Sequence, residues 1–431
     1  MEKRAMVMKL IEARCSQPLE FFSSNLERAV DEITRRGFHA WLVDALTEAY
    51  MEARKGKRAT YDMHEFELNW EKNILNLAQS IEERVYEPGS SISFVVFEPK
   101  VREIFAAPAR DRSSHHLLYN LGVENWDKEF IPTSTSCRVG KGTLYAIKMA
   151  QKQMEEVTEH WTKKARVVKL DLQGYFMSLP RKKLCRWVTK GLERHLKPYL
   201  NQKAGRLLYA LCKFLWERVL MDDPVKKARK RGATKNWNPG ILPPNKSLFC
   251  QTPGYGIVIG NLTSQLASNI YLDQLDKFVT VTLGYKYYGR YVDDFYIMVA
   301  EEDYARLKRD IKLIEDFLWN ELELTLHPKK RYMQSVYKGM PYLGARIYPH
   351  CLYPSDRLQA KFRKIVRDFD RGVGNTESMI SYLGHMRHLD ADEFVKKVFR
   401  EYSWDYEVYL EAKKEPRRPM ADLVEEMARK I

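Results

Sequence analysis

The chain has 431 residues and a formal net charge of +15, and 45% of its residues are hydrophobic. This composition excludes a disordered chain and predicts a globular protein of two or three domains with a substantial core. A charge this positive favours a polyanionic partner, most often nucleic acid, over a basic protein with no such role.

The six cysteines are widely scattered, with no CxxC pair and no Cys/His cluster. Neither a zinc site nor a disulfide framework is therefore expected, and a reducing compartment fits. No apolar run approaches the roughly 20 residues of a membrane span, and no signal peptide opens the chain. We expect a cytoplasmic protein with no membrane partner.

Apolar residues at helical spacing dominate the chain up to about Tyr86. Short strands are expected next, in SISFVVFEP and REIFAAP, followed by another helical stretch. ARVVKLDL, residues 165–172, predicts a strand, and a long helical region follows from Pro180 to about Met221. Residues 226–235 and the following NWNPGILPPNKS form a basic, Pro- and Gly-rich loop or insertion, which is either solvated or in contact with nucleic-acid backbone.

The part of the chain after this insertion begins with a helix expected at about 262–279, and the sequence ends in mostly helical segments. In the last of these, EFVKKVFREY places Phe394, Val398 and Tyr402 on one helix face, with Val395 and Phe399 beside them.

Two adjacent aspartates interrupt a strongly strand-forming run, YKYYGRYVDDFYIMVA. Residues 285–292 and 295–300 suit strands, so Asp293 and Asp294 are expected at a hairpin tip. Strand interiors are depleted in Asp, but a turn accepts both residues and lets their carboxylates face a common space. Alone, the pattern favours a plain surface turn with two solvated acids.

A third carboxylate occurs in a matching setting. In RVVKLDLQGYF, Asp171 alternates with the leucines and lies on the opposite face, at the end of a strand that Gly174 terminates. A strand-end Asp beside a hairpin-tip pair is suited to two Mg²⁺ ions about 3.5–4 Å apart, which need oxygen ligands and neutralising charge. This pattern predicts a two-metal site that activates a 3′-hydroxyl and neutralises nucleotide phosphates.

These motifs resemble those of prokaryotic retroelement reverse transcriptases. The resemblance extends over six ordered segments: FEPKVREIFAAPARDRSSHH, STSCRVGKGT, KLDLQGYF, KSLFCQTPGYGIVIGNLTSQLASNIYLDQLD with YVDD, LTLHPKKR and YLGARI. The GNLTSQ form at 260–265 is similar to that of diversity-generating retroelement enzymes and related, partly defence-associated bacterial groups.

The resemblance implies a role for residues at each motif. Those implied as catalytic are Asp171, Asp293, Asp294 and Lys330, and as metal ligands Asp171, Leu172, Asp293 and Asp294. The residues implied to contact the dNTP are Lys100, Arg102, Arg112, Phe176, Ile259 and Gly260. The residues implied to contact the primer are Tyr291, Tyr342, Leu343 and Gly344.

Several of these roles have alternatives. Phe176 is expected to block a ribose 2′-hydroxyl, with core packing as the less favoured alternative, and Ile259, where many such enzymes have Gln, could merely pack beneath its loop. Arg110 could replace Arg112, Lys329 could replace Lys330, and the lysines could be solvated surface charges.

The implied fold is α+β, a right-hand polymerase with an antiparallel palm sheet and a helical N-terminal extension. The expected domains are the extension at 1–86, fingers at 87–163, a palm at 164–340 with the insertion near 222–247, and a primer grip and helical thumb at 341–431.

The expected activity is RNA-directed DNA synthesis with two Mg²⁺ ions, for which Mn²⁺ would substitute. Implied partners are a structured noncoding RNA template, the DNA product, dNTPs and an accessory protein or second polymerase. One alternative is a defence-associated polymerase making repetitive, weakly templated or protein-primed DNA. The other is a non-catalytic RNA-binding maturase or assembly protein.

Overall fold

The computed structural model describes residues 25–57, 60–98, 100–402 and 404–414. The expected N-terminal extension and thumb each continue into terminal residues outside these ranges. The described chain is mixed α+β, and its sheets are antiparallel except for one short parallel pair. No helix in these ranges is both long and apolar enough to cross a membrane.

The chain divides into two compact units, each built from two stretches of sequence. The first unit takes the described part of Met1–Phe130 together with Gly174–Gln274. The second unit takes Ile131–Gln173 and the described part of Leu275–Ile431.

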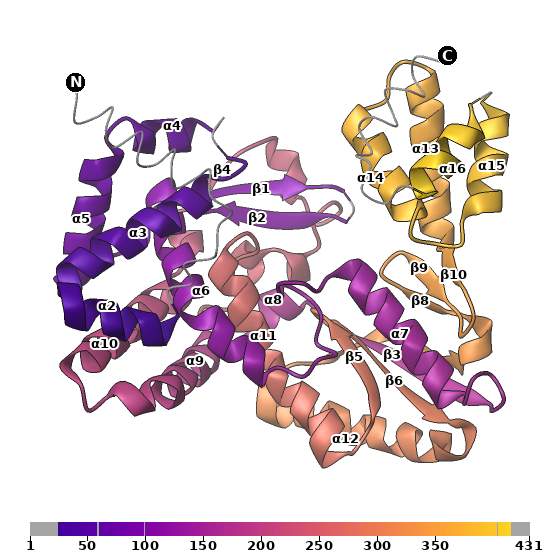
Figure 1. The fold of residues 1–431 in the computed structure, drawn as a ribbon, viewed down its shortest axis with the longest axis horizontal. Helices are drawn as coiled ribbons and strands as arrows, with labels where there is room; N and C mark the ends of the chain where they lie inside the picture. Colours follow the sequence, from indigo (N-terminus) through magenta and orange to yellow (C-terminus); the bar gives the residue numbers. More distant parts are fainter. Residues whose placement is uncertain (1–24, 58–59, 99, 403, 415–431) are drawn as a thin grey trace. The chain divides into compact units, whose positions relative to one another are not determined.

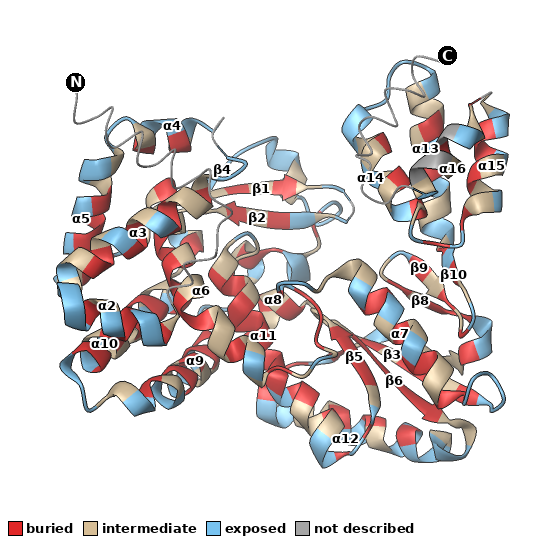
Figure 2. Ribbon diagram, in the orientation of Figure 1, coloured by how far each residue is buried: buried red, intermediate tan, exposed pale blue. Residues whose placement is uncertain are grey.

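Amphipathic helices make up most of the first unit (Figures 1 and 2). They are α2 (Leu26–Arg36), α3 (Phe38–Arg54), α4 (Tyr61–Glu67), α5 (Trp70–Glu82), α6 (Ala109–Glu129), α8 (Tyr175–Ser178), α9 (Arg181–Leu196), α10 (Lys203–Met221) and most of α11 (Leu262–Lys277). The helical region expected from Pro180 to Met221 is thus two helices, separated by a 3₁₀ turn that contains Pro198, which cannot continue an α-helix.

Trp126 of α6 is the centre of the packing between three of these helices. Its indole is 1% exposed and meets Trp216 of α10 edge to face, with ring centroids 6.2 Å apart. On α9, a Cβ at Gly191 would lie 2.9 Å from the indole Nε1, so only glycine allows this approach. The fit fixes the spacing of α6 and α9.

A small three-stranded sheet completes the first unit. The expected hairpin forms β1 (Ile92–Val96) and β2 (Arg102–Ala106), and β4 (Arg229–Lys230) from the insertion pairs in parallel with β1. The rest of the insertion is a series of 3₁₀ turns: Pro224–Lys226, Thr234–Trp237, Pro244–Lys246 and Leu248–Cys250.

The second unit contains a four-stranded antiparallel sheet in the order β5-β6-β3-β7 (Figure 1). Its strands are β3 (Ala165–Leu172), which matches the predicted bounds, β5 (Tyr287–Tyr291), β6 (Asp294–Ala300) and β7 (Leu326–Ser335). Helix α7 (Thr143–Val157) contacts β5 and β6, with Ala150 and Met154 in the same buried cluster as Val167 of β3, and α12 (Tyr304–Leu322) contacts β6.

The C-terminal part of this unit is a small antiparallel sheet followed by helices. The elements are β8 (Met340–Tyr342), β9 (Ala345–Ile347), β10 (Leu352–Pro354), α13 (Asp356–Asp370), α14 (Thr376–Met386), α15 (Asp392–Glu401) and α16 (Tyr406–Lys414). In α15 the buried residues are Val395, Val398 and Phe399, whereas Phe394 and Tyr402 of the expected face are only partly buried.

Candidate active site

The end of β3 brings two of the predicted catalytic acids together. In the antiparallel ladder between β3 and β6, Asp171 is directly opposite Asp294. Directly opposed residues on one face have Cβ atoms about 4.5–5.5 Å apart, so the two carboxylates share one space. The alternation of Asp171 with buried Leu170 and Leu172 is as the sequence predicted.

The hairpin tip differs by one residue from the expectation. Asp294 is the first residue of β6 and pairs with Tyr291, so Val292 and Asp293 alone form the turn. The Leu172 amide donates to the Asp293 carbonyl at 3.1 Å, which ties this turn to the end of β3. All three aspartates are therefore fixed by the backbone of adjacent strands.

The turn places a β-branched residue in a strained conformation. Val292 has a φ of +57°, a left-handed value that costs free energy for any residue with a branched Cβ. Both of its main-chain polar groups are bound: its amide donates to Ser136 Oγ at 2.9 Å, and its carbonyl accepts from Arg290 Nη1 at 3.0 Å. The strain is thus offset by one contact from Ser136, outside the hairpin, and one from Arg290 of β5.

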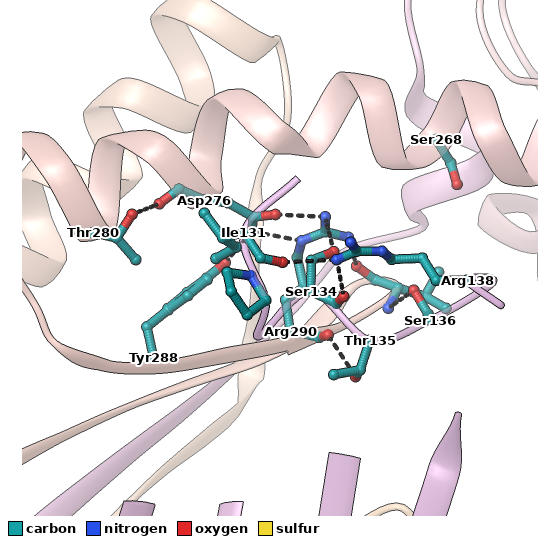
Figure 3. A network of polar contacts seen from close by, with 12 residues as sticks. Ile131, Ser134, Thr135, Ser136, Arg138, Ser268, Asp276, Thr280, Tyr288 and Arg290 are labelled. Atoms are coloured by element: carbon teal, nitrogen blue, oxygen red, sulfur yellow. Dashed lines mark hydrogen bonds and ion pairs between the residues drawn. The ribbon is translucent and has the colours of Figure 1, made fainter. Parts of the chain in front are cut away.

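Arg290 and Asp276 anchor these contacts (Figure 3). Arg290 Nε and Nη2 donate to the two oxygens of Asp276, each at 2.7 Å, and both side chains are fully buried. Arg290 Nη2 also donates to Ser134 Oγ at 2.9 Å, and the Tyr288 hydroxyl donates to Asp276 at 2.6 Å. The bidentate geometry and these additional hydrogen bonds leave neither charge of this buried pair unpartnered.

The segment STSCRVGKGT runs beside β5. The Arg290 amide donates to the Thr133 carbonyl and the Thr135 amide donates to the Arg290 carbonyl, each at 3.0 Å, so the segment extends the edge of the sheet. Arg138 holds the loop closed by donating to the carbonyls of Ile131 and Ser134 at 2.7 and 2.8 Å (Figure 3).

Sequence reasoning missed Arg290, Asp276, Ser134 and Ser136 as supports of the site. The available signal was an arginine inside an apolar strand three residues before the aspartates, since a buried arginine requires a carboxylate partner.

Two lysines lie against the aspartates. Lys330 of β7 has its Nζ 2.7 Å from Asp171 Oδ1, and half of its side chain is exposed. Lys169 of β3 has its Nζ 3.0 Å from Asp294 Oδ2 and also donates to the Pro341 carbonyl at 2.9 Å. The structure thus brings Lys330, rather than its neighbour Lys329, onto a predicted catalytic acid.

Asp294 keeps one oxygen without a partner. Its Oδ1 is buried and accepts no hydrogen bond, and only a fifth of its side chain is exposed. Burial raises the pKa of Asp294 to about 6; the charges of Asp171 and Asp293 act in the same direction, and Lys169 opposes them. Such a carboxylate is one for which a cation would supply the missing interaction.

These features bear on the predicted Mg²⁺ ions. Within the described ranges, no group of three or more His, Cys, Asp or Glu side chains forms a recognisable metal cluster. The donor set nevertheless fits hard cations, because Asp171 and Asp294 are directly opposite each other, Asp293 is adjacent in the turn and Asp294 has an unpaired buried oxygen. The Leu172 side chain is buried, so only its main-chain carbonyl could serve as a ligand.

The predicted primer residues have unequal access to solvent. Tyr342 is 2% exposed and its ring packs edge to face on Tyr296, so it is part of the core. Leu343 and Gly344, with φ of +50° and +91°, form the turn between β8 and β9, and Gly344 is exposed. Tyr291 is partly buried, with its hydroxyl 3.3 Å from Thr143 Oγ1.

The predicted cationic dNTP contacts all lie in the first unit. Lys100 and Arg102 are exposed at the turn and the start of the β1–β2 hairpin. Arg112 is largely buried on α6, with Nη1 3.6 Å from Asp62 of α4. Its proposed alternative, Arg110, donates to the Glu87 carbonyl. Neither arginine is therefore a free surface cation.

Gly260 and Ile259 are placed by packing against β2. A Cβ at Gly260, where φ is +134°, would lie 2.6 Å from the Phe105 carbonyl oxygen, so the close approach here is to a strand. The Ile259 carbonyl accepts from the Phe105 amide at 2.9 Å, and its side chain packs on the cluster of Phe105, Met177 and Leu248. Phe176 on α8 is only partly buried, unlike its neighbour Tyr175.

A scan against models of protein families and a search of curated proteins each found no match to this chain.

Proposed function

We propose that this chain is an RNA-directed DNA polymerase that extends a 3′-hydroxyl with dNTPs by two-metal catalysis. The observation that carries the proposal is the pairing of Asp171 with Asp294 across β3 and β6, with Asp293 adjacent in a turn braced from both sides. Two carboxylates paired across neighbouring strands, with a third aspartate next to them in the turn, suit metal-assisted phosphoryl transfer better than any role in folding.

Each residue of the site has a distinct task in this proposal. Asp171, Asp293 and Asp294 would hold the ions, together with the Leu172 carbonyl. When bound, two Mg²⁺ ions would activate the attacking hydroxyl and neutralise charge on the phosphates. Lys330 can reach the same space and donate a proton to the departing pyrophosphate, and Lys169 keeps Asp294 oriented.

The proposal also extends to the architecture and partners implied by the resemblance. The β1–β2 hairpin would belong to the fingers, the four-stranded sheet to the palm and α13–α16 to the thumb. Partial exposure of Phe176 is compatible with its proposed role against the ribose 2′-hydroxyl. The partners would be an RNA template, dNTPs and the DNA product.

Primer extension tests this function. We expect the purified full chain to incorporate dTTP on poly(rA)/oligo(dT) with Mg²⁺, and incorporation to stop with EDTA. Asp293→Asn should reduce the rate at least a thousandfold without unfolding the chain, because Asn preserves shape and removes charge. Asp316→Asn is the matched control, since Asp316 is a half-exposed acid on α12 of the same unit.

The outcomes separate the alternatives. Incorporation that does not depend on the template sequence would favour a weakly templated polymerase. RNA binding without any incorporation would favour a non-catalytic RNA-binding protein. An Asp293→Asn variant within tenfold of the parent would contradict the two-metal assignment.

A further inference from the structure

The basic insertion between α10 and α11 is attached to the hairpin by one buried carboxylate. Glu103 of β2 is fully buried and accepts three hydrogen bonds, all from the insertion. Trp237 Nε1 and Ser247 Oγ donate to its Oε1 at 2.8 and 3.1 Å, and the Leu248 amide donates to its Oε2 at 2.6 Å. The insertion therefore has a defined position on the sheet.

This attachment sets the direction of the insertion's side chains. The Arg229 amide donates to the Ser91 carbonyl at 2.9 Å and the Arg231 amide to the Ser93 carbonyl at 2.8 Å. Arg229 is in register with Ile92, so residues 229 and 231 share the sheet face of Ile92 and Phe94. The Arg231 guanidinium lies over the Phe94 ring, 5.1 Å from its centroid.

Lys230 points to the opposite face. Its Nζ lies 4.1 Å from the centroid of the Phe249 ring and 5.1 Å from that of Trp237, over the side where Glu103 is buried. Because side chains alternate along β4, Lys230 packs within the insertion, whereas its neighbours Arg229 and Arg231 lie on the opposite face. Figure 1 shows β4 alongside β1, and Figure 2 shows this segment as exposed.

The insertion is strongly basic. After Asp222 and Asp223 at its start, residues 224–247 contain seven basic residues and no acidic residue. Lys227 is paired with Asp222 at 2.8 Å. Arg229, Arg231 and Lys235 are exposed, and among the described residues none of the three has a carboxylate partner.

On the open face of the sheet, the cations adjoin apolar side chains. Phe94 and Ile104 are opposite each other in the β1–β2 register, and both are partly exposed, as is Ile92. Guanidinium groups over an apolar, aromatic-bearing sheet are the combination that binds phosphates and unstacked bases together. A duplex, with its bases stacked inside, would use only the cations.

We propose that this face is a binding surface for single-stranded nucleic acid. The backbone phosphates contact Arg229 and Arg231, and the bases lie against Phe94 and Ile104. The inference rests on the proposed function in one respect: in a polymerase, the bound strand is the unpaired template. The binding surface itself is testable without synthesis.

Fluorescence anisotropy with the full chain and a labelled single-stranded RNA 20-mer tests the surface. Arg229→Ala/Arg231→Ala should weaken binding at least tenfold and lower the slope of log K against log salt by about 2. The control, Arg186→Ala/Lys190→Ala, removes the same charge from exposed positions on α9 and should change affinity less than twofold. Equal losses of affinity in both double variants would overturn the proposal. Binding by Arg229→Ala/Arg231→Ala within twofold of the parent would also overturn it.

A second variant distinguishes a binding surface that Glu103 holds in a fixed position from nonspecific electrostatic attraction. Glu103→Gln removes a negative charge, so attraction alone predicts tighter binding. Our proposal predicts weaker binding, by about threefold or more, because a Gln amide cannot accept all three hydrogen bonds and the insertion loosens. Tighter binding by Glu103→Gln would contradict the positioned surface.

Competitors define the ligand class. Unlabelled single-stranded RNA should displace the probe at lower concentration than a duplex of equal charge or poly-glutamate; equal displacement by either would overturn the assignment to single strands. If the chain binds RNA through these arginines but makes no DNA, the polymerase proposal fails while the surface stands. If it makes DNA while Arg229→Ala/Arg231→Ala binds normally, the surface alone fails.

Discussion

Glu103 and Asp294 are both carboxylates in β-sheets and both are largely withdrawn from water, but their surroundings differ. Glu103 accepts hydrogen bonds on both oxygens, from three uncharged donors. Asp294 has a lysine on one oxygen and no partner on the other, with two further aspartates beside it. Burial raises the pKa of Glu103 as well, although its hydrogen bonds oppose the shift.

This difference separates two uses of a buried charge. A carboxylate whose acceptor sites are filled by the protein stabilises a local arrangement, here the position of the insertion. A carboxylate left partly unsatisfied beside like charges costs folding free energy, which is typical of a functional rather than a structural position. Asp276 is fully buried and both of its oxygens are paired with Arg290, so like Glu103 it stabilises a local arrangement.

The largest effect expected from this comparison is on catalysis. Asp294→Asn should lower DNA synthesis on the order of a thousandfold or more, because it removes a metal-binding charge. The free energy of unfolding should stay the same or rise, since the variant no longer buries a partly unpaired charge. Initial rates and urea unfolding measure the two effects. A destabilised variant with substantial activity would reverse the interpretation of Asp294.

The next effect concerns the pair that braces the hairpin turn. Asp276→Asn leaves the buried Arg290 guanidinium without its counter-charge and should lower the free energy of unfolding by about 3–5 kcal/mol. Asp316→Asn breaks an exposed pair with Lys312 and should cost less than about 1 kcal/mol. Chemical denaturation of both variants checks this; equal stability would mean that the Arg290–Asp276 pair does not support the turn.

A smaller loss is expected at Glu103. Glu103→Gln places an amide NH₂ among donors and should lower the free energy of unfolding by about 1–3 kcal/mol. Glu83→Gln, at the residue that follows α5, is the control and should have almost no effect, because the exposed Glu83 carboxylate accepts a hydrogen bond from exposed Gln79. Denaturation with tryptophan fluorescence is suitable, because Trp237 is one of the donors. No loss in Glu103→Gln would show that the insertion does not depend on this residue.

The sequence was sufficient where local periodicity determines structure. Residues 165–172 alternate strictly enough to predict both the strand and the orientation of Asp171. The hairpin around Asp293 was also predicted, but Asp294 was assigned to the turn because strand propensity disfavours Asp, whereas pairing with β3 extends β6 to include it.

Other features depend on contacts between distant parts of the chain. The Arg290–Asp276 pair, the burial of Arg112 beside α4 and the attachment of the insertion to Glu103 all join residues whose separation in sequence carries no periodic signal. Composition suggested only that residues 226–235 form a loop, since a two-residue strand is too short to produce alternation.

The smallest effect extends the comparison to two adjacent aromatic residues on α8. Tyr175 is buried and its hydroxyl donates to the Ser268 carbonyl at 2.7 Å, so its interactions are complete within the first unit. Phe176 has ring contact with Tyr175 but remains partly exposed, and an apolar ring left open is available to a ligand.

Phe176→Ala should lower the ratio of kcat/KM for dNTP over rNTP by about tenfold, because the space for a 2′-hydroxyl opens. Tyr175→Phe should instead lower stability by about 1 kcal/mol through the lost hydrogen bond and leave the ratio unchanged. Steady-state incorporation of dTTP and UTP on the same template measures both variants. An unchanged ratio in Phe176→Ala would show that this ring serves packing. A changed ratio in Tyr175→Phe would show that the buried residue on α8 also affects the choice between dNTP and rNTP.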